Sequence, residues 1–157
     1  MKKYSTILFD LDGTLTDSSQ GIINSIIYAL KKYDINDYDM TLLRKFLGPP
    51  LHESFEKFFG FDKEKSLQAV KYYREYFSTK GLLENEVYCG ITDLLQNLKE
   101  NGKTLIVATS KPQPFTDRIM VHFDLEKNFD FIAGSNMDTT RSKKRKLSNM
   151  HLVSVIL

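Results

Sequence analysis

The sequence predicts an α/β fold, in which helices cover a parallel sheet and a block of helices is inserted near the start of the chain. Short apolar runs typical of buried strands alternate with helical patterns, and this alternation is typical of parallel sheets. Between about residues 16 and 84 the alternation stops, and only helical patterns occur. We therefore expect two domains: a discontinuous core of residues 1–15 and 85–157, and an inserted helical domain of residues 16–84.

The first strand and the helical block are predicted from apolar spacing and from the residues that interrupt it. A strand is expected over residues 4–10, because the apolar run Ile7-Leu8-Phe9 precedes Asp10. The spacing predicts four helices, over about residues 19–33, 39–46, 51–59 and 62–79. Their predicted breaks are Gly48-Pro49-Pro50 and Gly81. Leu67, Val70, Tyr73 and Phe77 are expected to share one broad face of the fourth helix.

After residue 90 the chain returns to alternating helix and strand patterns. A helix is expected from Ile91 to a stop at Asn101-Gly102, with an inner face that includes Leu94 and Leu95. A buried strand follows over residues 103–109. Ser110 is then predicted to cap the next helix, with Pro112 in its first turn. A third, shorter strand is expected over residues 129–133.

Composition places the chain among ordinary globular proteins. It has 157 residues, of which 41% are hydrophobic and 27% are charged, and both values are typical of folded domains. The single cysteine, Cys89, excludes an internal disulfide and fits a reducing, cytoplasmic location. The apolar run after Met1-Lys2-Lys3 is too short for a signal peptide, and no apolar stretch reaches the length that spans a membrane.

Two carboxylates at the end of the first predicted strand are the principal candidates for chemistry. Asp10 and Asp12 are spaced i, i+2, so both side chains can point to the same face of a strand. Open α/β sheets form their sites at this carboxyl end. Two adjacent carboxylates repel each other unless a cation binds or one of them holds a proton. Both a bound cation and a held proton occur where a metal-bound nucleophilic aspartate lies beside a general-acid aspartate. This pair of groups acts on phosphoryl groups.

The stretch Asp10-Leu11-Asp12-Gly13-Thr14-Leu15-Thr16 resembles the first signature motif of the haloacid dehalogenase-like (HAD) superfamily. The resemblance implies a three-layer, Rossmann-like core with an inserted α-helical cap. It also implies that Asp10 is the nucleophile and that Asp12 acts as general acid and then as general base. Mg²⁺ would be held by the Asp10 carboxylate and the Asp12 main-chain carbonyl. Thr14 would brace the loop and is a candidate for substrate binding.

Thr109 ends the second predicted strand, where members of this superfamily place a serine or threonine that hydrogen-bonds the phosphoryl oxygens. The main-chain N–H of Ser110, at the expected N-terminus of a helix, also suits an anion. In the alternative interpretation, Thr109 only ends a strand beside a helix cap. We expect the functional role, because Thr109 then adds a second component to the carboxylate pair.

Residues 134–144 resemble the Gly-Ser-x-x-Asp-Gly-Thr-Arg-Ser-x-Lys pattern of HAD phosphatases of the phosphoglycolate phosphatase and 5′-nucleotidase types. This resemblance assigns the cation at the phosphate to Lys144, with Lys143 as the alternative. A solvated basic run is the competing interpretation of the segment. The loop at Gly48 and Pro49 resembles one that faces the active site and selects substrate in these relatives, although a plain turn between helices explains it equally well.

The resemblance ends near residue 144. The relatives continue through a helix to a fourth strand with an acidic motif that completes the magnesium site, whereas residues 145–157 contain no acidic residue. We therefore expect a core that is incomplete at its C-terminus, as in a truncated or frame-disrupted product. The five bases within residues 141–146 are expected to be solvated or to face phosphate, because no aromatic residue lies between them as in many nucleic-acid-binding segments.

Together these observations predict a magnesium-dependent phosphatase that hydrolyses a small, phosphoglycolate- or nucleotide-like phosphate monoester through an aspartyl-phosphate intermediate. The expected partner is a small phosphorylated metabolite, with no nucleic acid and no membrane, and the oligomeric state is left open. The alternative is a catalytically impaired fragment that binds phosphate or a partner without turnover.

Overall fold

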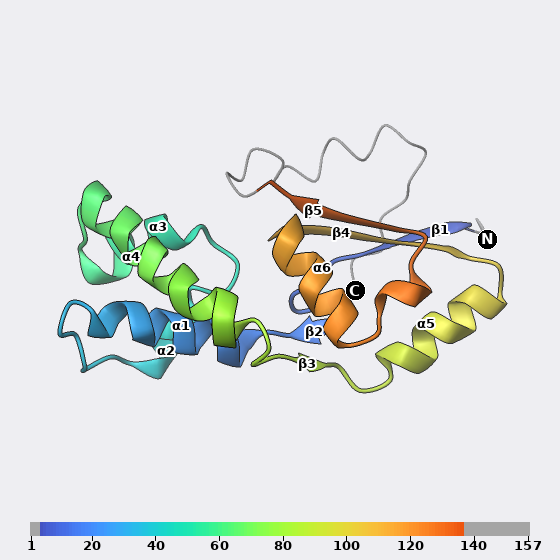
Figure 1. The fold of residues 1–157 in the computed structure, drawn as a ribbon, viewed down its shortest axis with the longest axis horizontal. Helices are drawn as coiled ribbons and strands as arrows, with labels where there is room; N and C mark the ends of the chain where they lie inside the picture. Colours follow the sequence, from blue (N-terminus) through green and yellow to red (C-terminus); the bar gives the residue numbers. More distant parts are fainter. Residues whose placement is uncertain (1–3, 137–157) are drawn as a thin grey trace. The chain divides into compact units, whose positions relative to one another are not determined.

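The computed structural model describes residues 4–136, and Figure 1 shows their fold. The chain divides into two compact units, residues 1–17 with 86–157 and residues 18–85, and each unit is described by itself. The sequence places these boundaries at residues 16 and 84, one or two residues away from those in the structure.

The first unit is built on a three-stranded parallel sheet in the order β1-β4-β5. Its strands are β1 (Thr6–Phe9), β4 (Thr104–Pro112) and β5 (Phe131–Ser135). Phe9 at the end of β1 lies opposite Val107 of β4, so the carboxyl ends of these two strands meet at one edge. The predicted α/β class with a parallel sheet is confirmed.

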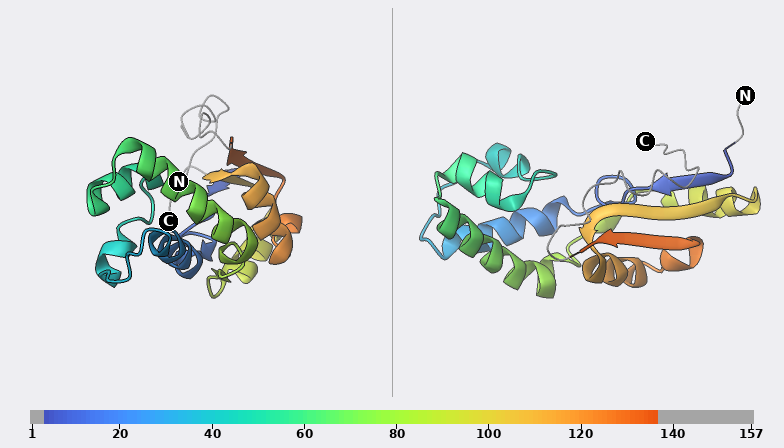
Figure 2. Two further views of the ribbon diagram at one scale, coloured as in Figure 1. Left: turned by 60° about the vertical axis from the view of Figure 1, so that its left-hand side comes forward. Right: turned by 90° about the horizontal axis from the view of Figure 1, so that it is seen from above.

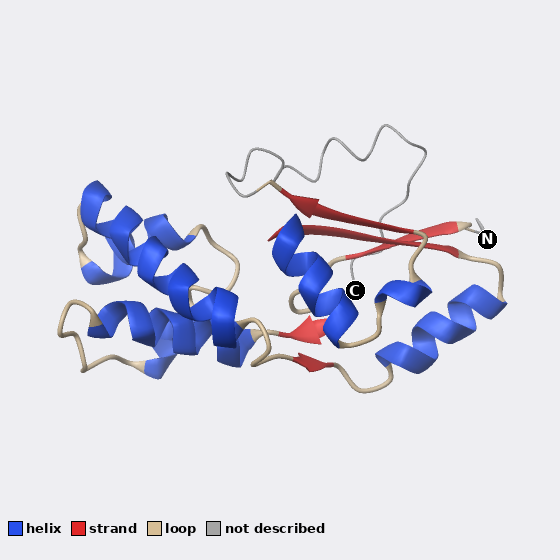
Figure 3. Ribbon diagram, viewed as in Figure 1, coloured by secondary structure: helices blue, strands red, loops and turns tan. Residues whose placement is uncertain are grey.

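Helices and a small ribbon complete the first unit, as the secondary-structure colours of Figure 3 show. Helix α5 (Ile91–Glu100) packs against β4, and α6 (Gln113–His122) packs against both β4 and β5. A short 3₁₀ turn, η2 (Glu126–Asn128), leads into β5. The two-residue strands β2 (Thr16–Asp17) and β3 (Glu86–Val87) form an antiparallel pair at the point where the chain leaves and re-enters this unit.

The core of the first unit lies between the sheet and its helices. Its side chains are apolar and 5% exposed or less: Phe9, Leu11, Leu15, Leu95, Leu105, Val107, Ile119, Met120 and Leu125. Leu94, expected on the inner face of α5, is 37% exposed, so Leu95 is the principal core residue of that helix.

The start of α6 differs from the prediction. Ser110 does not cap this helix: it lies within β4, and Pro112 is the residue that precedes the first helical turn. The strand continues past residue 109 because Pro112 pairs with Ser135 of β5 after a register shift. A neighbouring strand thus extends β4 where the local sequence favours a helix.

The second unit is entirely helical. Its elements are α1 (Ser19–Lys31), α2 (Met40–Arg44), α3 (Leu51–Phe59), α4 (Lys63–Tyr76) and a π-helical segment, η1 (Phe77–Gly81). Figures 1 and 2 show α1 and α4 side by side, and both α1 and α3 contact α4. The core of this unit is rich in aromatic rings, with Phe46 and Phe55 fully or almost fully buried at a centroid distance of 5.1 Å.

Two features of the fourth helix of this block depart from the sequence prediction. Leu67, expected on one broad apolar face with Tyr73, is 48% exposed, whereas Ser66 and Ala69 are fully buried and Tyr73 is mostly buried. The small residues face inward because α1 and α3 both pack closely on α4. The helix also changes to π geometry at Phe77 before it reaches Gly81.

Candidate functional site at the carboxyl ends of β1 and β4

The segment after β1 forms a tight loop that its own main chain holds. The Leu11 carbonyl accepts hydrogen bonds from the N–H groups of residues 14–16, at 2.9 to 3.3 Å, and the Gly13 N–H donates to the Thr16 carbonyl at 2.8 Å. Gly13 has a φ of 75°, which favours glycine because it has no Cβ. The backbone from which Asp10 and Asp12 extend is therefore fixed.

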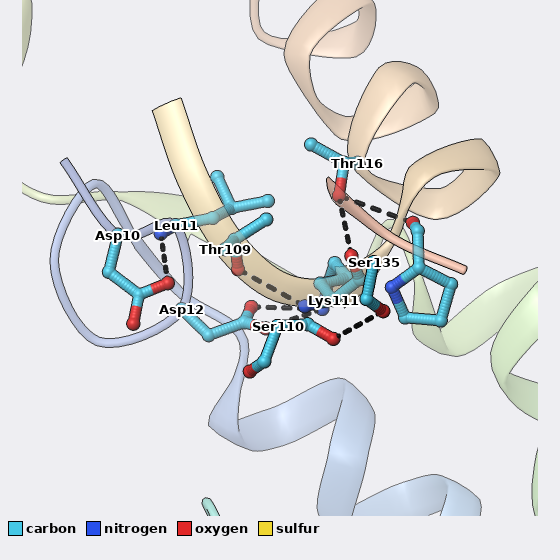
Figure 4. Close-up of polar contacts among 9 residues, drawn as sticks. Asp10, Leu11, Asp12, Thr109, Ser110, Lys111, Thr116 and Ser135 are labelled. Carbon is cyan, nitrogen blue, oxygen red and sulfur yellow. Dashed lines mark hydrogen bonds and ion pairs between the residues drawn. The ribbon is translucent and has the colours of Figure 1, made fainter. Parts of the chain in front are cut away.

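Asp10 follows directly after β1. One of its carboxylate oxygens, Oδ1, accepts a hydrogen bond from the Leu11 N–H at 2.8 Å. Because β1 and β4 are neighbouring parallel strands, with Phe9 opposite Val107, the residues that follow them lie at the same edge of the sheet. Figure 4 shows Asp10, Asp12 and Thr109 gathered at this edge.

The last part of β4 carries Thr109 and Lys111 on one face. The register of β4 against β5 shifts between Ala108 and Pro112, an irregularity of the type that redirects side chains beside functional sites. Thr109 and Lys111 are 8% and 7% exposed, whereas Ser110 between them is exposed. The Thr109 hydroxyl oxygen accepts a hydrogen bond from the Lys111 N–H at 3.2 Å.

Lys111, near the end of β4, forms an ion pair with Asp12 of the loop after β1. Its Nζ lies 2.9 Å from Oδ1 and 2.8 Å from Oδ2 of Asp12, so the ammonium group contacts both carboxylate oxygens. The lysine side chain is only 5% exposed and that of Asp12 is 33% exposed. A charge as buried as this is costly without a partner, and the pair compensates part of that cost.

A second layer of hydrogen bonds holds the junction of β4 with α6. The Ser135 hydroxyl donates to the Ser110 carbonyl at 2.7 Å, and the Thr116 hydroxyl lies 3.3 Å from the Lys111 carbonyl, to which it donates. Both hydroxyl-bearing residues are buried. Gly134 approaches α6 so closely that a Cβ atom would lie 2.7 Å from the Gln113 Cα. The backbone around Lys111 is therefore fixed from two directions.

The other site residues predicted from the sequence lie at different places in the chain, and some lie outside the described residues. Thr14 lies in the loop after β1, where its N–H donates a hydrogen bond to the Leu11 carbonyl. The N–H of Ser110 is not at a helix N-terminus, so the predicted basis for its anion binding is wrong. Gly48, with a φ of 108°, and Pro49 are exposed in the turn between α2 and α3 of the second unit. Lys143 and Lys144 lie outside the described residues, as does the segment predicted to lack the acidic motif.

Lys111 is the residue of this site that the sequence prediction missed. The prediction treated the Ser110-Lys111-Pro112 stretch as the opening of a helix, which would have placed its side chains at helical spacing. A signal was nevertheless present, since Lys111 is two residues from Thr109 and an extended strand puts i and i+2 on one face. The extension of β4 along β5 was not visible locally.

A magnesium ion, which the superfamily resemblance implies, can be compared with the donor atoms present. Among residues 4–136, no three His, Cys, Asp or Glu side chains gather as a metal site. Magnesium, however, is usually held through one or two carboxylates and keeps several waters. The Asp10 carboxylate and the main-chain oxygen of Asp12 supply donors of the required type, so the end of β1 fits the ion.

Comparison with known proteins identifies a family. Residues 7–150 match the profile of the family described as haloacid dehalogenase-like hydrolase. The chain is 46% identical over 145 residues to a 5′-nucleotidase of Pseudomonas aeruginosa, covering 92% of this chain and 66% of that protein. It is 39% identical over 138 residues to the tyrosine-protein kinase PtkA of Mycobacterium tuberculosis, covering 88% of this chain and 47% of the kinase.

A solved structure gives the same result. A protein from Clostridium acetobutylicum described as a predicted phosphatase superposes with a TM-score of 0.84 at 48% identity, covering 96% of this chain and 69% of that one. The chain spans about half to two thirds of the length of the two curated relatives named above. Within residues 4–136, none of the helices is long and apolar enough to cross a membrane.

Proposed function

Because the chain belongs to the haloacid dehalogenase-like hydrolase family, we propose that it hydrolyses a small phosphate monoester at the carboxyl ends of β1 and β4. One observation carries the proposal: Asp10 and Asp12 extend from a fixed loop at the end of β1, beside the Thr109 hydroxyl of β4. Phosphoryl transfer needs a nucleophile, a proton donor for the leaving group and charge stabilisation around the phosphoryl oxygens. These residues supply groups of all three kinds.

Asp10 and Asp12 divide the chemistry between two steps. In the first, a carboxylate oxygen of Asp10 bonds to phosphorus, the bond to the leaving oxygen breaks, and Asp12 gives that oxygen a proton. In the second, water attacks phosphorus, Asp12 takes a proton from the water, and the bond to Asp10 breaks to release phosphate. Each step leaves Asp12 in the protonation state that the other requires.

Charge on the phosphoryl oxygens is stabilised from three sides. Thr109 accepts a bond from the Lys111 N–H, and a hydroxyl that accepts one bond keeps its proton for another partner. We assign that partner as a phosphoryl oxygen. Lys144, or Lys143 beside it, would add a cation. Magnesium held by the Asp10 carboxylate and the Asp12 main-chain oxygen would neutralise charge on the phosphoryl group when bound.

The substrate proposed first is a nucleoside 5′-monophosphate, with phosphoglycolate second. The support for this order is the 46% identity to a protein named 5′-nucleotidase. In this account the chain acts on a small phosphorylated metabolite in the cytoplasm, and neither a nucleic acid nor a membrane takes part.

A phosphate-release assay of the full chain with Mg²⁺ tests the proposal. The panel consists of nucleoside 5′-monophosphates, phosphoglycolate, pyrophosphate and p-nitrophenyl phosphate. We expect magnesium-dependent release that is greatest for a nucleoside monophosphate and falls on the order of 10³-fold or more in Asp10→Asn, which lacks the nucleophile. The matched control is Asp37→Asn, since Asp37 lies exposed in the loop between α1 and α2.

Two results of this assay would contradict the proposal. One is phosphate release that persists unchanged in Asp10→Asn, which would place the chemistry elsewhere. The other is the absence of release from every ester while phosphate still binds, which would identify a chain that binds its ligand without turnover.

A further inference from the structure

The mechanism above leaves one buried charge without a role. The ammonium group of Lys111 is 2.8 and 2.9 Å from the two carboxylate oxygens of Asp12, and its side chain is 5% exposed. Figure 4 shows the two side chains pointing toward each other from β4 and from the loop after β1. A lysine that only stabilised the fold could sit at the surface, where its desolvation would cost nothing.

Several contacts fix the backbone of Lys111 before its side chain meets Asp12. Its N–H donates to the Thr109 hydroxyl, and its carbonyl accepts from the buried Thr116 hydroxyl. The adjacent carbonyl of Ser110 accepts from Ser135 of β5. The register shift in β4 therefore delivers this lysine from a rigid strand rather than from a mobile loop.

Asp12 has the opposite character. It lies in a loop, its side chain is one third exposed, and its carboxylate can rotate unless a partner holds it. A partner that contacts both oxygens restricts that rotation. Proton transfer depends on such restriction, since small displacements of a catalytic group from its productive geometry reduce the rate strongly.

We propose that Lys111 is the positioning residue for Asp12, holding the carboxylate that transfers protons at a fixed place beside the leaving oxygen. This proposal rests on the phosphatase function proposed above. Lys111 acts through Asp12 and does not itself touch the substrate, which separates its role from that of the cation assigned to Lys144 or Lys143.

The choice of leaving group makes the role measurable. A poor leaving group, such as the alkoxide of an alkyl phosphate, needs a well-placed proton donor, whereas p-nitrophenolate leaves with little help. In Lys111→Met we expect kcat for an alkyl phosphate to fall about tenfold or more, and kcat for p-nitrophenyl phosphate to fall much less, with KM nearly unchanged. Lys111→Arg keeps a cation that can contact both oxygens and should restore part of the loss.

One variant background and one control variant complete the design. In Asp12→Asn, the further change Lys111→Met should have little additional effect, because residues that act as a unit are not additive. Lys127→Met is the matched control, since Lys127 is an exposed lysine paired with Asp124 three residues away. It should leave kcat for both esters unchanged.

Three outcomes would overturn the proposal. Lys111→Met could keep full kcat, could lose the same factor on both esters, or could lose as much in the Asp12→Asn background as in the wild type.

A separate arm measures the melting temperatures of Lys111→Met, Asp12→Asn and the double variant, and shifts that simply add would show that the pair does not form. Absence of turnover in the wild type would overturn the phosphatase function itself, and the melting arm would still decide whether Lys111 holds Asp12.

Discussion

Each of the two carboxylates after β1 has a hydrogen-bonding contact in the structure. Asp10 accepts a hydrogen bond from the neutral Leu11 N–H, whereas Asp12 contacts the ammonium group of Lys111. Where two nearby carboxylates experience different environments, one can serve as nucleophile while the other exchanges protons. We propose the role of nucleophile for Asp10 and the role of proton transfer for Asp12.

Another hydrogen-bonded aspartate lies at the far end of the sheet. Asp130, before β5, accepts a hydrogen bond from Lys99 of α5 at 2.8 Å and another from the Leu105 N–H of β4 at 2.8 Å. The bond from Lys99 and then that from Leu105 lower the pKa of Asp130 below its ordinary value. Asp130 therefore connects three elements through its ionised form.

This shift predicts an acid-dependent contribution to stability. Because the folded-state pKa is lower than the unfolded one, the contribution is present well above the ordinary aspartate pKa of about 3.9 and is lost as the pH falls below it. The difference in free energy of unfolding between wild type and Asp130→Asn should shrink over that range in urea titrations. Lys99→Met removes the charged hydrogen-bond partner of Asp130 and should therefore weaken the same pH dependence of stability. A difference that stays constant from neutral to acid pH would contradict the assignment.

At the scale of elements, one close approach shapes the helical unit. Gly21 of α1 faces Gly81 at the end of η1, and a Cβ atom on Gly21 would lie 1.9 Å from the Gly81 carbonyl oxygen. A backbone atom cannot swing aside as a flexible side chain does. The approach leaves room for glycine alone, and the chain accommodates it where α4 changes to π geometry.

The variant Gly21→Ala should therefore destabilise the chain although alanine favours helices. We expect a loss of about 1–3 kcal/mol in the free energy of unfolding, the range typical of overpacking, measured by urea denaturation. The matched control is Gln20→Ala in the preceding position, which is exposed and should change stability by less than about 0.5 kcal/mol. Equal stability of the two variants would show that α1 and η1 can separate at no cost.

At the scale of the whole molecule, the sequence predicts what local patterns encode and misses what distant partners impose. Helix α3 has the predicted bounds of residues 51–59, because Pro50 and Gly60 mark its ends. The loop after β1 was likewise recognisable from its own residues. The start of α6 was not, because pairing with Ser135 prolongs β4 beyond Thr109. Lys111 was missed for the same reason.

The fold class followed from the alternation of strand and helix patterns, whereas which face of α4 is buried did not. Leu67 is exposed because α1 and α3 contact α4 where its small residues lie. Hydrophobicity alone would predict that Leu67 is more buried than Ser66. Patterns in one segment predict that a helix forms, but its neighbours decide which side chains they cover.

The proposed phosphatase reaction depends on Asp10 as the group that receives the phosphoryl group, and this can be measured directly. The full chain with Mg²⁺ is mixed with a phosphate ester labelled with ³²P, quenched in acid within a single turnover and digested to peptides. We predict acid-stable label on the peptide that contains Asp10, and none in Asp10→Asn. Label on another residue, or turnover without any labelled protein, would contradict the assignment of Asp10 as the nucleophile.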